Sequence, residues 1–132
     1  GRFIFSTWGE LGRNDFAACL TGALAEFFPD HPPDFIARVP HGYHDPARIR
    51  SDLESAGYRF ITVAPVTTNG AAERPEDVAT AFCQGTPLRN EFEARGASLK
   101  AVTEHVARAI ERKFGSGPLS GEAYALVVTA AT

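Results

Sequence analysis

The sequence predicts an α/β protein with a small sheet of three strands and flanking helices. Three apolar runs indicate the strands, near residues 2–7, 58–65 and 122–130. The last run, from Glu122 to Thr129, is the longest β-branched stretch and shows neither helical spacing nor alternation. Such a run is typical of a strand buried on both faces in the middle of a sheet. We therefore expect the strand order first, last, middle.

Two helices are predicted before the second strand. Asn14 suits the N-cap of a helix over residues 15–28, because the apolar residues that follow it recur at helical spacing. Asp45 and Pro46 are a cap and a first helical residue for the second helix. Gly57 suits the left-handed position beyond its end. The second strand then follows almost without a loop.

Residues 75–114 are predicted to form an all-helical insertion between the second and third strands. Its three helices begin at Pro75, at Thr86-Pro87 and at Ser98, and each ends near a glycine: Gly85, Gly96 and Gly115. The polar segment 66–74 before the insertion is expected to be mobile. Residues 115–121 after it are expected to form a connecting loop. With no internal repeat and no domain boundary, residues 1–132 are expected to form a single unit.

Composition limits the classes of function. A net charge of −3 argues against a nucleic-acid surface, which needs clustered Lys and Arg. No apolar run approaches the length that spans a bilayer. The only cysteines, Cys19 and Cys83, lie in separate helical patterns and do not form a disulfide framework. We expect a reducing, cytoplasmic environment.

The common motifs of catalysis and metal binding do not occur. The glycine-rich segment 115–121 follows a helix and precedes a strand, whereas phosphate-binding loops follow a strand and open a helix. His31, His41 and His44 with Asp45 lack the ligand pairs of a zinc site, so we interpret them as loop and turn residues with ordinary hydrogen bonds and expect no metal. No serine or cysteine stands in a nucleophile motif.

Trp8 is the most informative single residue. It follows the first strand and precedes a glycine-rich loop, the position at which α/β sheets contact their ligands. Packing against Phe5 and Phe16 is an equally good interpretation. On the residues alone, both stay open.

A resemblance to a known family covers the whole chain. Gly1-Arg-Phe-Ile-Phe-Ser-Thr-Trp8, with Asn14-Asp-Phe16, resembles the fifth strand and following loop of class I S-adenosylmethionine-dependent methyltransferases, in the subgroup near the ubiquinone and menaquinone biosynthesis enzymes. Asp52-Leu-Glu-Ser-Ala-Gly-Tyr58 resembles the entry into their sixth strand, and residues 123–129 their seventh. The resemblance implies a mixed sheet with an antiparallel last strand, in a partial Rossmann-like methyltransferase fold.

The resemblance extends only to the C-terminal half of that family. The glycine-rich loop after the first family strand and the acidic ribose-binding residue after the second are missing, so this chain is expected not to bind S-adenosylmethionine alone. The resemblance implies instead that this chain forms the part of a methyltransferase that holds a small-molecule methyl acceptor. The residues implied there follow the first strand or lie in a helical lid: Trp8, Asn14, Phe16, Phe82, Gln84 and Arg89. No catalytic base is indicated.

Two hypotheses follow from these observations. In the first, the chain is the substrate-side portion of a methyltransferase. In the second, it is a non-catalytic module for dimerisation or partner binding. A glycine-rich βαβ half before this chain in the reading frame would support the first. In both cases Phe3, Ile4 and Phe5 are expected on an unpaired apolar strand edge, which natural proteins normally cover. We therefore expect a homodimer through the first strand.

Overall fold

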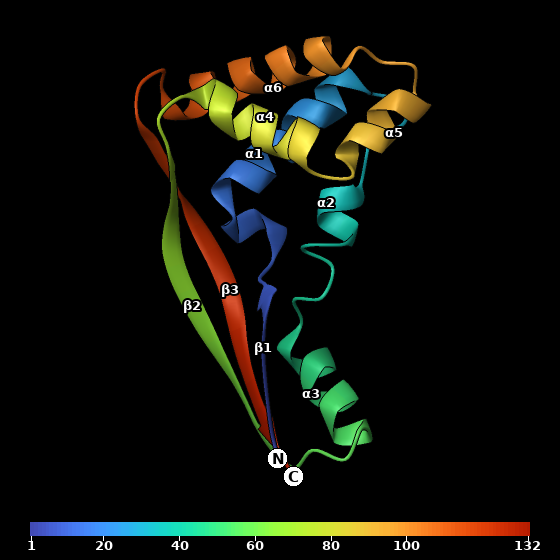
Figure 1. The fold of residues 1–132 in the computed structure, drawn as a ribbon, viewed down its shortest axis with the longest axis vertical. Helices are drawn as coiled ribbons and strands as arrows, with labels where there is room; N and C mark the ends of the chain where they lie inside the picture. Colours follow the sequence, from blue (N-terminus) through green and yellow to red (C-terminus); the bar gives the residue numbers. More distant parts are fainter.

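The computed structural model describes all 132 residues, and its centre is a three-stranded sheet. The strands are β1 (Arg2–Trp8), β2 (Phe60–Ala72) and β3 (Leu119–Ala131). Their order is β1-β3-β2, and β3 is antiparallel to both neighbours (Figure 1). The predicted order and the direction of the last strand are confirmed. Because β1 and β2 do not touch, the sheet is antiparallel throughout and not mixed.

Strand β2 ends at Ala72, seven residues beyond the end predicted from the sequence. It continues through the segment expected to be mobile, and Val66 to Ala72 pair with Ala125 to Leu119 of β3. The prediction for residues 66–72 was wrong because a polar segment was interpreted as a mobile loop, although polar residues also occur in exposed strands. Thr67 and Thr68 are β-branched and favour extended backbone, and their side chains are exposed on a strand that lies at the sheet edge. For the same reason β3 begins at Leu119, inside the predicted loop.

Helix α3 (Pro46–Ser55) covers one face of the sheet. Ile49 and Leu53 on this helix are buried against alternate residues of β3 (Leu126, Val128 and Ala130). The helix begins as predicted, with the Asp45 carboxylate accepting a hydrogen bond from the Ala47 amide at 2.9 Å. Gly57 has a φ of 94°, the left-handed conformation expected after the helix end.

A helical layer lies across one end of the sheet (Figure 1). It consists of α1 (Asp15–Phe27), α4 (Pro75–Gly85), α5 (Leu88–Ala94) and α6 (Leu99–Phe114), which share the larger apolar core. The all-helical insertion and its Ser98 cap are confirmed, the cap accepting a hydrogen bond from the Ala101 amide at 3.2 Å. Two short elements, η1 (Leu11–Arg13) and α2 (Phe35–Arg38), occur in predicted loops. None of the helices combines the length and the apolar character required to span a membrane.

The other face of the sheet is bare along much of its length. The side chains of Ile4, Phe60, Val66 and Val127 point to this face, and they are 58%, 72%, 42% and 36% exposed. The prediction that β3 is buried on both faces is therefore wrong at Val127. Its central position does follow from its apolar character, but the second covering layer is missing.

Candidate functional site

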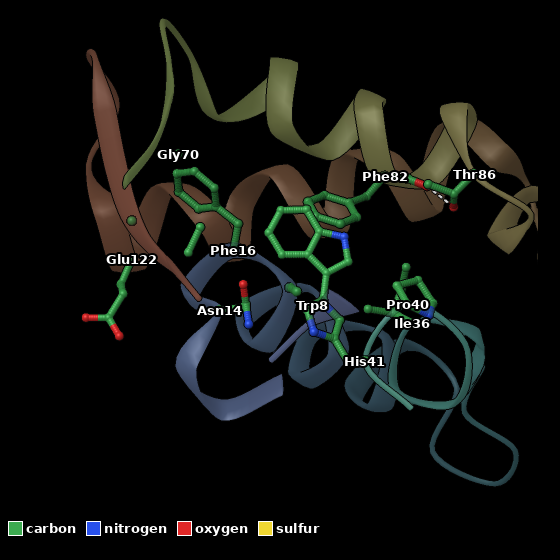
Figure 2. Close-up of a pocket in the computed structure, with 13 residues that line it drawn as sticks. Trp8, Asn14, Phe16, Ile36, Pro40, His41, Gly70, Phe82, Thr86 and Glu122 are labelled. Atoms are coloured by element: carbon green, nitrogen blue, oxygen red, sulfur yellow. Dashed lines mark hydrogen bonds between the residues drawn. The ribbon is translucent and has the colours of Figure 1, made fainter. Parts of the chain in front are cut away.

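A cavity of about 350 Å³ lies where the end of β1 meets the helical layer. Its lining is mainly apolar, and Figure 2 shows the Trp8 indole in the middle of the lining residues with His41 beneath it. Four of the six predicted substrate residues line this cavity: Trp8, Asn14, Phe16 and Phe82. Trp8 is half exposed, which favours the ligand-contact interpretation over simple packing.

Two facing glycines make room for the Phe16 ring. Gly70 of β2 and Gly121 of β3 are directly opposite in the register. A Cβ on Gly121 would lie 3.3 Å from the Phe16 ring, tighter than an ordinary contact, whereas a Cβ on Gly70 would lie 3.4 Å from it. The ring therefore rests on bare backbone at both glycines, and Gly121 is the position at which a side chain would crowd it. No local pattern indicates this pair, because both residues fall in segments that the sequence predicts to lie outside strands.

Asn14 fastens the start of α1 to the sheet. Its amide nitrogen donates to the carbonyl oxygens of Glu10 and Tyr124 at 3.0 and 3.3 Å, and its oxygen accepts from the Tyr124 amide at 3.0 Å. Asn14 stands at the N-cap position as predicted, but its side chain forms no cap hydrogen bond. The Asn14 side chain bonds instead to the backbone of Tyr124 in β3. The Asp15 carboxylate accepts a further hydrogen bond from the Glu122 amide at 2.7 Å. Asn14 therefore shapes the cavity and has no amide hydrogen left for a ligand.

His41 lines the cavity, although the sequence did not single it out as a site residue. Its side chain is buried, and Nδ1 lies 2.8 Å from the Gly9 carbonyl oxygen. The ring centroids of His41 and Trp8 are 6.0 Å apart. Gly42 allows the turn, since a Cβ there would collide with the Arg38 carbonyl oxygen. The expected ordinary hydrogen bond is present, but its partner is 32 positions away, which no local pattern reveals.

Gln84 and Arg89 are not brought into the cavity. Helical spacing directs Phe82 and Thr86 to the cavity, while Gln84 is exposed and donates a hydrogen bond to the Thr103 hydroxyl at 3.3 Å. Arg89 is exposed and paired with Glu93 at 3.2 Å. The sequence placed these residues near Phe82 correctly, but on the wrong side of the helices.

The cavity contains no free charge. Glu122 is the one charged residue in the lining, and its carboxylate pairs with Arg13 at 3.3 Å. The Arg13 guanidinium also lies 3.7 Å from the centre of the Tyr124 ring. The Thr86 hydroxyl donates to the Phe82 carbonyl oxygen at 2.6 Å and accepts from the Leu88 amide at 3.2 Å. Such a lining suits a small neutral ligand.

The residues present do not form a site for a nucleotide cofactor or a metal. Backbone amides of the loop after β1 donate within the chain: Gly9 to Tyr124, Arg13 to Glu10, and Asn14 to Leu11. They cannot form the cradle of amides that binds phosphate or nucleotide groups. No group of three or more His, Cys, Asp or Glu side chains could hold a metal ion.

Comparisons with known proteins do not assign the site, so its interpretation rests on its geometry. No protein-family model matches this chain. A search of curated proteins also gives no match.

Proposed function

We propose that this chain is the acceptor-binding portion of an S-adenosylmethionine-dependent methyltransferase with a partial Rossmann-like fold. One observation carries the proposal. A largely apolar cavity opens at the carboxyl end of β1, in a sheet whose last strand runs antiparallel between the other two. That end of a strand is where α/β proteins bind ligands, and the resemblance in sequence implies the acceptor contacts there.

The cavity favours a small, neutral, ring-containing acceptor. Its volume of about 350 Å³ falls at the lower end of the range for ligand pockets, which is roughly 300–1,000 Å³. The contribution of such a site to methyl transfer is to hold the acceptor in a fixed orientation. Since these residues do not fit the cofactor, the chain alone is expected to bind an acceptor without binding S-adenosylmethionine or transferring a methyl group. A reducing, cytoplasmic location belongs to the same proposal.

Trp8 provides a direct test of acceptor binding, because it is the only tryptophan in the chain. We expect neutral bicyclic aromatic compounds to change the Trp8 fluorescence in a saturable way. Phe82→Ala removes a cavity wall and should weaken this binding, whereas Arg89→Ala, outside the cavity, serves as the control. An equal loss in both variants, or no saturable change in the native chain, contradicts an acceptor site here.

The methyltransferase assignment needs a second test. The product of the whole reading frame that encodes these residues should transfer a labelled methyl group from S-adenosylmethionine, and Phe82→Ala should raise the KM for the acceptor. Calorimetry with the 132-residue chain and S-adenosylmethionine should show no binding. Micromolar binding to this chain, or a reading frame without a glycine-rich βαβ half before Gly1, argues against the proposal.

The exposed strand favours a second candidate, a module for dimerisation or partner binding. Phe3 and Ile4 on β1 are 45% and 58% exposed, whereas Phe5 is partly buried beneath α3. The edge of β1 away from β3 has no partner strand. We propose that a second copy of the chain pairs there. Under this candidate Phe82→Ala leaves self-association unchanged.

A further inference from the structure

Three arginines lie together at the end of the sheet opposite the cavity. Arg2 of β1, Arg50 of α3 and Arg59 before β2 line an open hollow of about 520 Å³, at the end of the sheet where both chain termini lie (Figure 1). Arg2 and Trp8 are the first and last residues of β1, so the hollow and the cavity are separated by about 20 Å. The hollow is therefore a different place on the molecule from the proposed acceptor site.

These arginines have no carboxylate to neutralise them. Every arginine in the chain forms an ion pair with Asp or Glu except Arg2, Arg50, Arg59 and Arg108. The first three of these line the one hollow, and its lining contains no Asp or Glu. Arg108 lies on α6, in the helical layer. A hollow with several uncompensated positive charges favours an anionic occupant.

The donors in the hollow suit the oxygen atoms of a phosphate group. Nη1 of Arg50 donates to the Ile61 carbonyl oxygen at 3.0 Å, and this is the only hydrogen bond that the three guanidinium groups form within the chain. The bond holds one guanidinium in place and leaves its other N–H groups free. Thr62 and Thr129 are directly opposite in the register and add two hydroxyl groups to the lining. Guanidinium groups and hydroxyls are donors that recognise phosphate.

Phe60 adds an apolar wall beside these donors. Its side chain is 72% exposed. Arg2 and Phe60 flank Ala131 of β3 from its two sides, and the small alanine leaves the space between them open. Because neighbouring strands lie about 4.8 Å apart, Arg2 and Phe60 are separated by about 10 Å, a gap that one small molecule can span.

A phosphate monoester satisfies this arrangement better than the other common anions. Its second pKa is about 6, so near neutral pH it carries close to two negative charges, whereas a carboxylate carries one. Nucleic acid needs basic residues along a longer track, and the chain has a net charge of −3. We propose that Arg2, Arg50 and Arg59 bind the phosphate of an aromatic phosphate monoester whose ring lies against Phe60. This binding site goes beyond the proposed function and does not depend on it.

NMR titration of the nitrogen-labelled chain with phenyl phosphate, at about pH 8, tests the site. The amide resonances of Arg59, Phe60 and Thr129 should shift in a saturable way, while those of Trp8 and Phe82 in the cavity should stay in place. Inorganic phosphate should shift the same resonances with weaker binding, because it has no ring. Phenol, which has no phosphate, should leave them unchanged.

Matched variants separate the charge from the ring. Arg59→Ala should weaken the binding of phenyl phosphate about three- to tenfold, the loss expected for one charge-assisted hydrogen bond at an exposed site. Arg108→Ala removes the same charge from another exposed, unpaired arginine and should leave binding unchanged. Phe60→Ala should reduce the affinity for phenyl phosphate to that for inorganic phosphate, without changing the affinity for inorganic phosphate.

Three results would overturn the proposal. The first is the absence of saturable shifts at these residues, or an equal loss in Arg59→Ala and Arg108→Ala. The second is a response to phenol as strong as the response to phenyl phosphate, since the arginines would then not hold the ligand. The third is an oligothymidylate that binds more tightly than phenyl phosphate and is lost in Arg59→Ala, which would make the hollow part of a nucleic-acid surface.

Discussion

At the residue scale, the Asn14 side chain forms the hydrogen bonds to β3 that a residue of a neighbouring strand would form. Its side-chain amide pairs with the backbone of Tyr124 just beyond the end of β1, where Gly9 also bonds to the Tyr124 carbonyl oxygen. The side chain thereby extends the pairing of β3 after β1 has turned away. This explains why a residue chosen for ligand contact is buried and already bonded.

Asn14→Ala should destabilise the fold markedly. The change leaves the Tyr124 amide without a partner, and a buried unpaired polar group costs about 1–3 kcal/mol. We expect the free energy of unfolding to fall by about 2–3 kcal/mol in urea denaturation. Asn90→Ala, at an exposed site on α5, should change it by less than about 0.5 kcal/mol. Similar losses in the two variants would show that the Asn14 bonds are not structural.

Cys83 predicts a pH dependence of stability. Burial raises the pKa of this fully enclosed thiol to about 11 from 9.0, against a smaller opposing effect of the Thr103 hydrogen bond. The folded state favours the protonated thiol, so its contribution is complete below pH 9.0 and is lost as the pH rises towards 11. By about pH 10, near the middle of that window, the loss is about 1 kcal/mol. Cys83→Ala should lack this part of the decline, and parallel pH profiles for the two proteins would contradict it.

The site residues that could be predicted from the sequence are those whose position follows from nearby residues in the chain. Trp8 and Phe16 could be predicted because their place after a strand is visible in the sequence. Phe82, predicted to lie in a helical lid, lines the cavity, whereas Gln84 two residues later points away from it, because the side of a helix that faces a cavity depends on tertiary packing. His41 could not be predicted as a lining residue, because the carbonyl oxygen that holds its ring, that of Gly9, is near only in the folded chain.

At the element scale, helix ends were easier to predict than strand ends. Asp45, Ser98 and Gly57 act locally, and each is found in the expected role. Strand length depends on the partner instead. β2 extends to Ala72 because β3 offers backbone groups that far, and polar residues tolerate this on an exposed edge.

Replacement by alanine should have different effects at the two facing glycines, Gly70 and Gly121. A Cβ on Gly121 would lie 3.0 Å from the Asp15 Cβ and 3.3 Å from the Phe16 ring, so α1 must move away from the sheet. We expect Gly121→Ala to destabilise the protein by about 1–3 kcal/mol and to change the Trp8 fluorescence response to ligands.

Gly70→Ala is the matched control. Its Cβ would meet the Phe16 ring at 3.4 Å, an ordinary contact, and alanine suits a strand better than glycine. Stability should change by less than about 1 kcal/mol. Urea denaturation of both variants makes the comparison, and an equal loss in both would show that Phe16 does not rest against Gly121 as described.

At the scale of the whole molecule, the bare sheet face and the free edge of β1 predict self-association. Light scattering at micromolar concentration should detect a dimer, and Ile4→Lys should weaken it at least about tenfold, because the change places a charge on the apolar strand. Val39→Lys alters a comparably exposed apolar residue outside the sheet and should leave the dimer intact. A monomer in which residues 2–7 are ordered and unpaired contradicts the dimer.

The position of β3 also affects how the chain folds during synthesis. β1 and β2 are made early, but each pairs only with β3, which lies at the far end of the sequence. A ribosome adds about 5–20 residues per second, so roughly 6–25 seconds pass between the synthesis of β1 and that of its partner. Throughout that interval the apolar residues of β1 can contact a chaperone or the same segment of a neighbouring nascent chain.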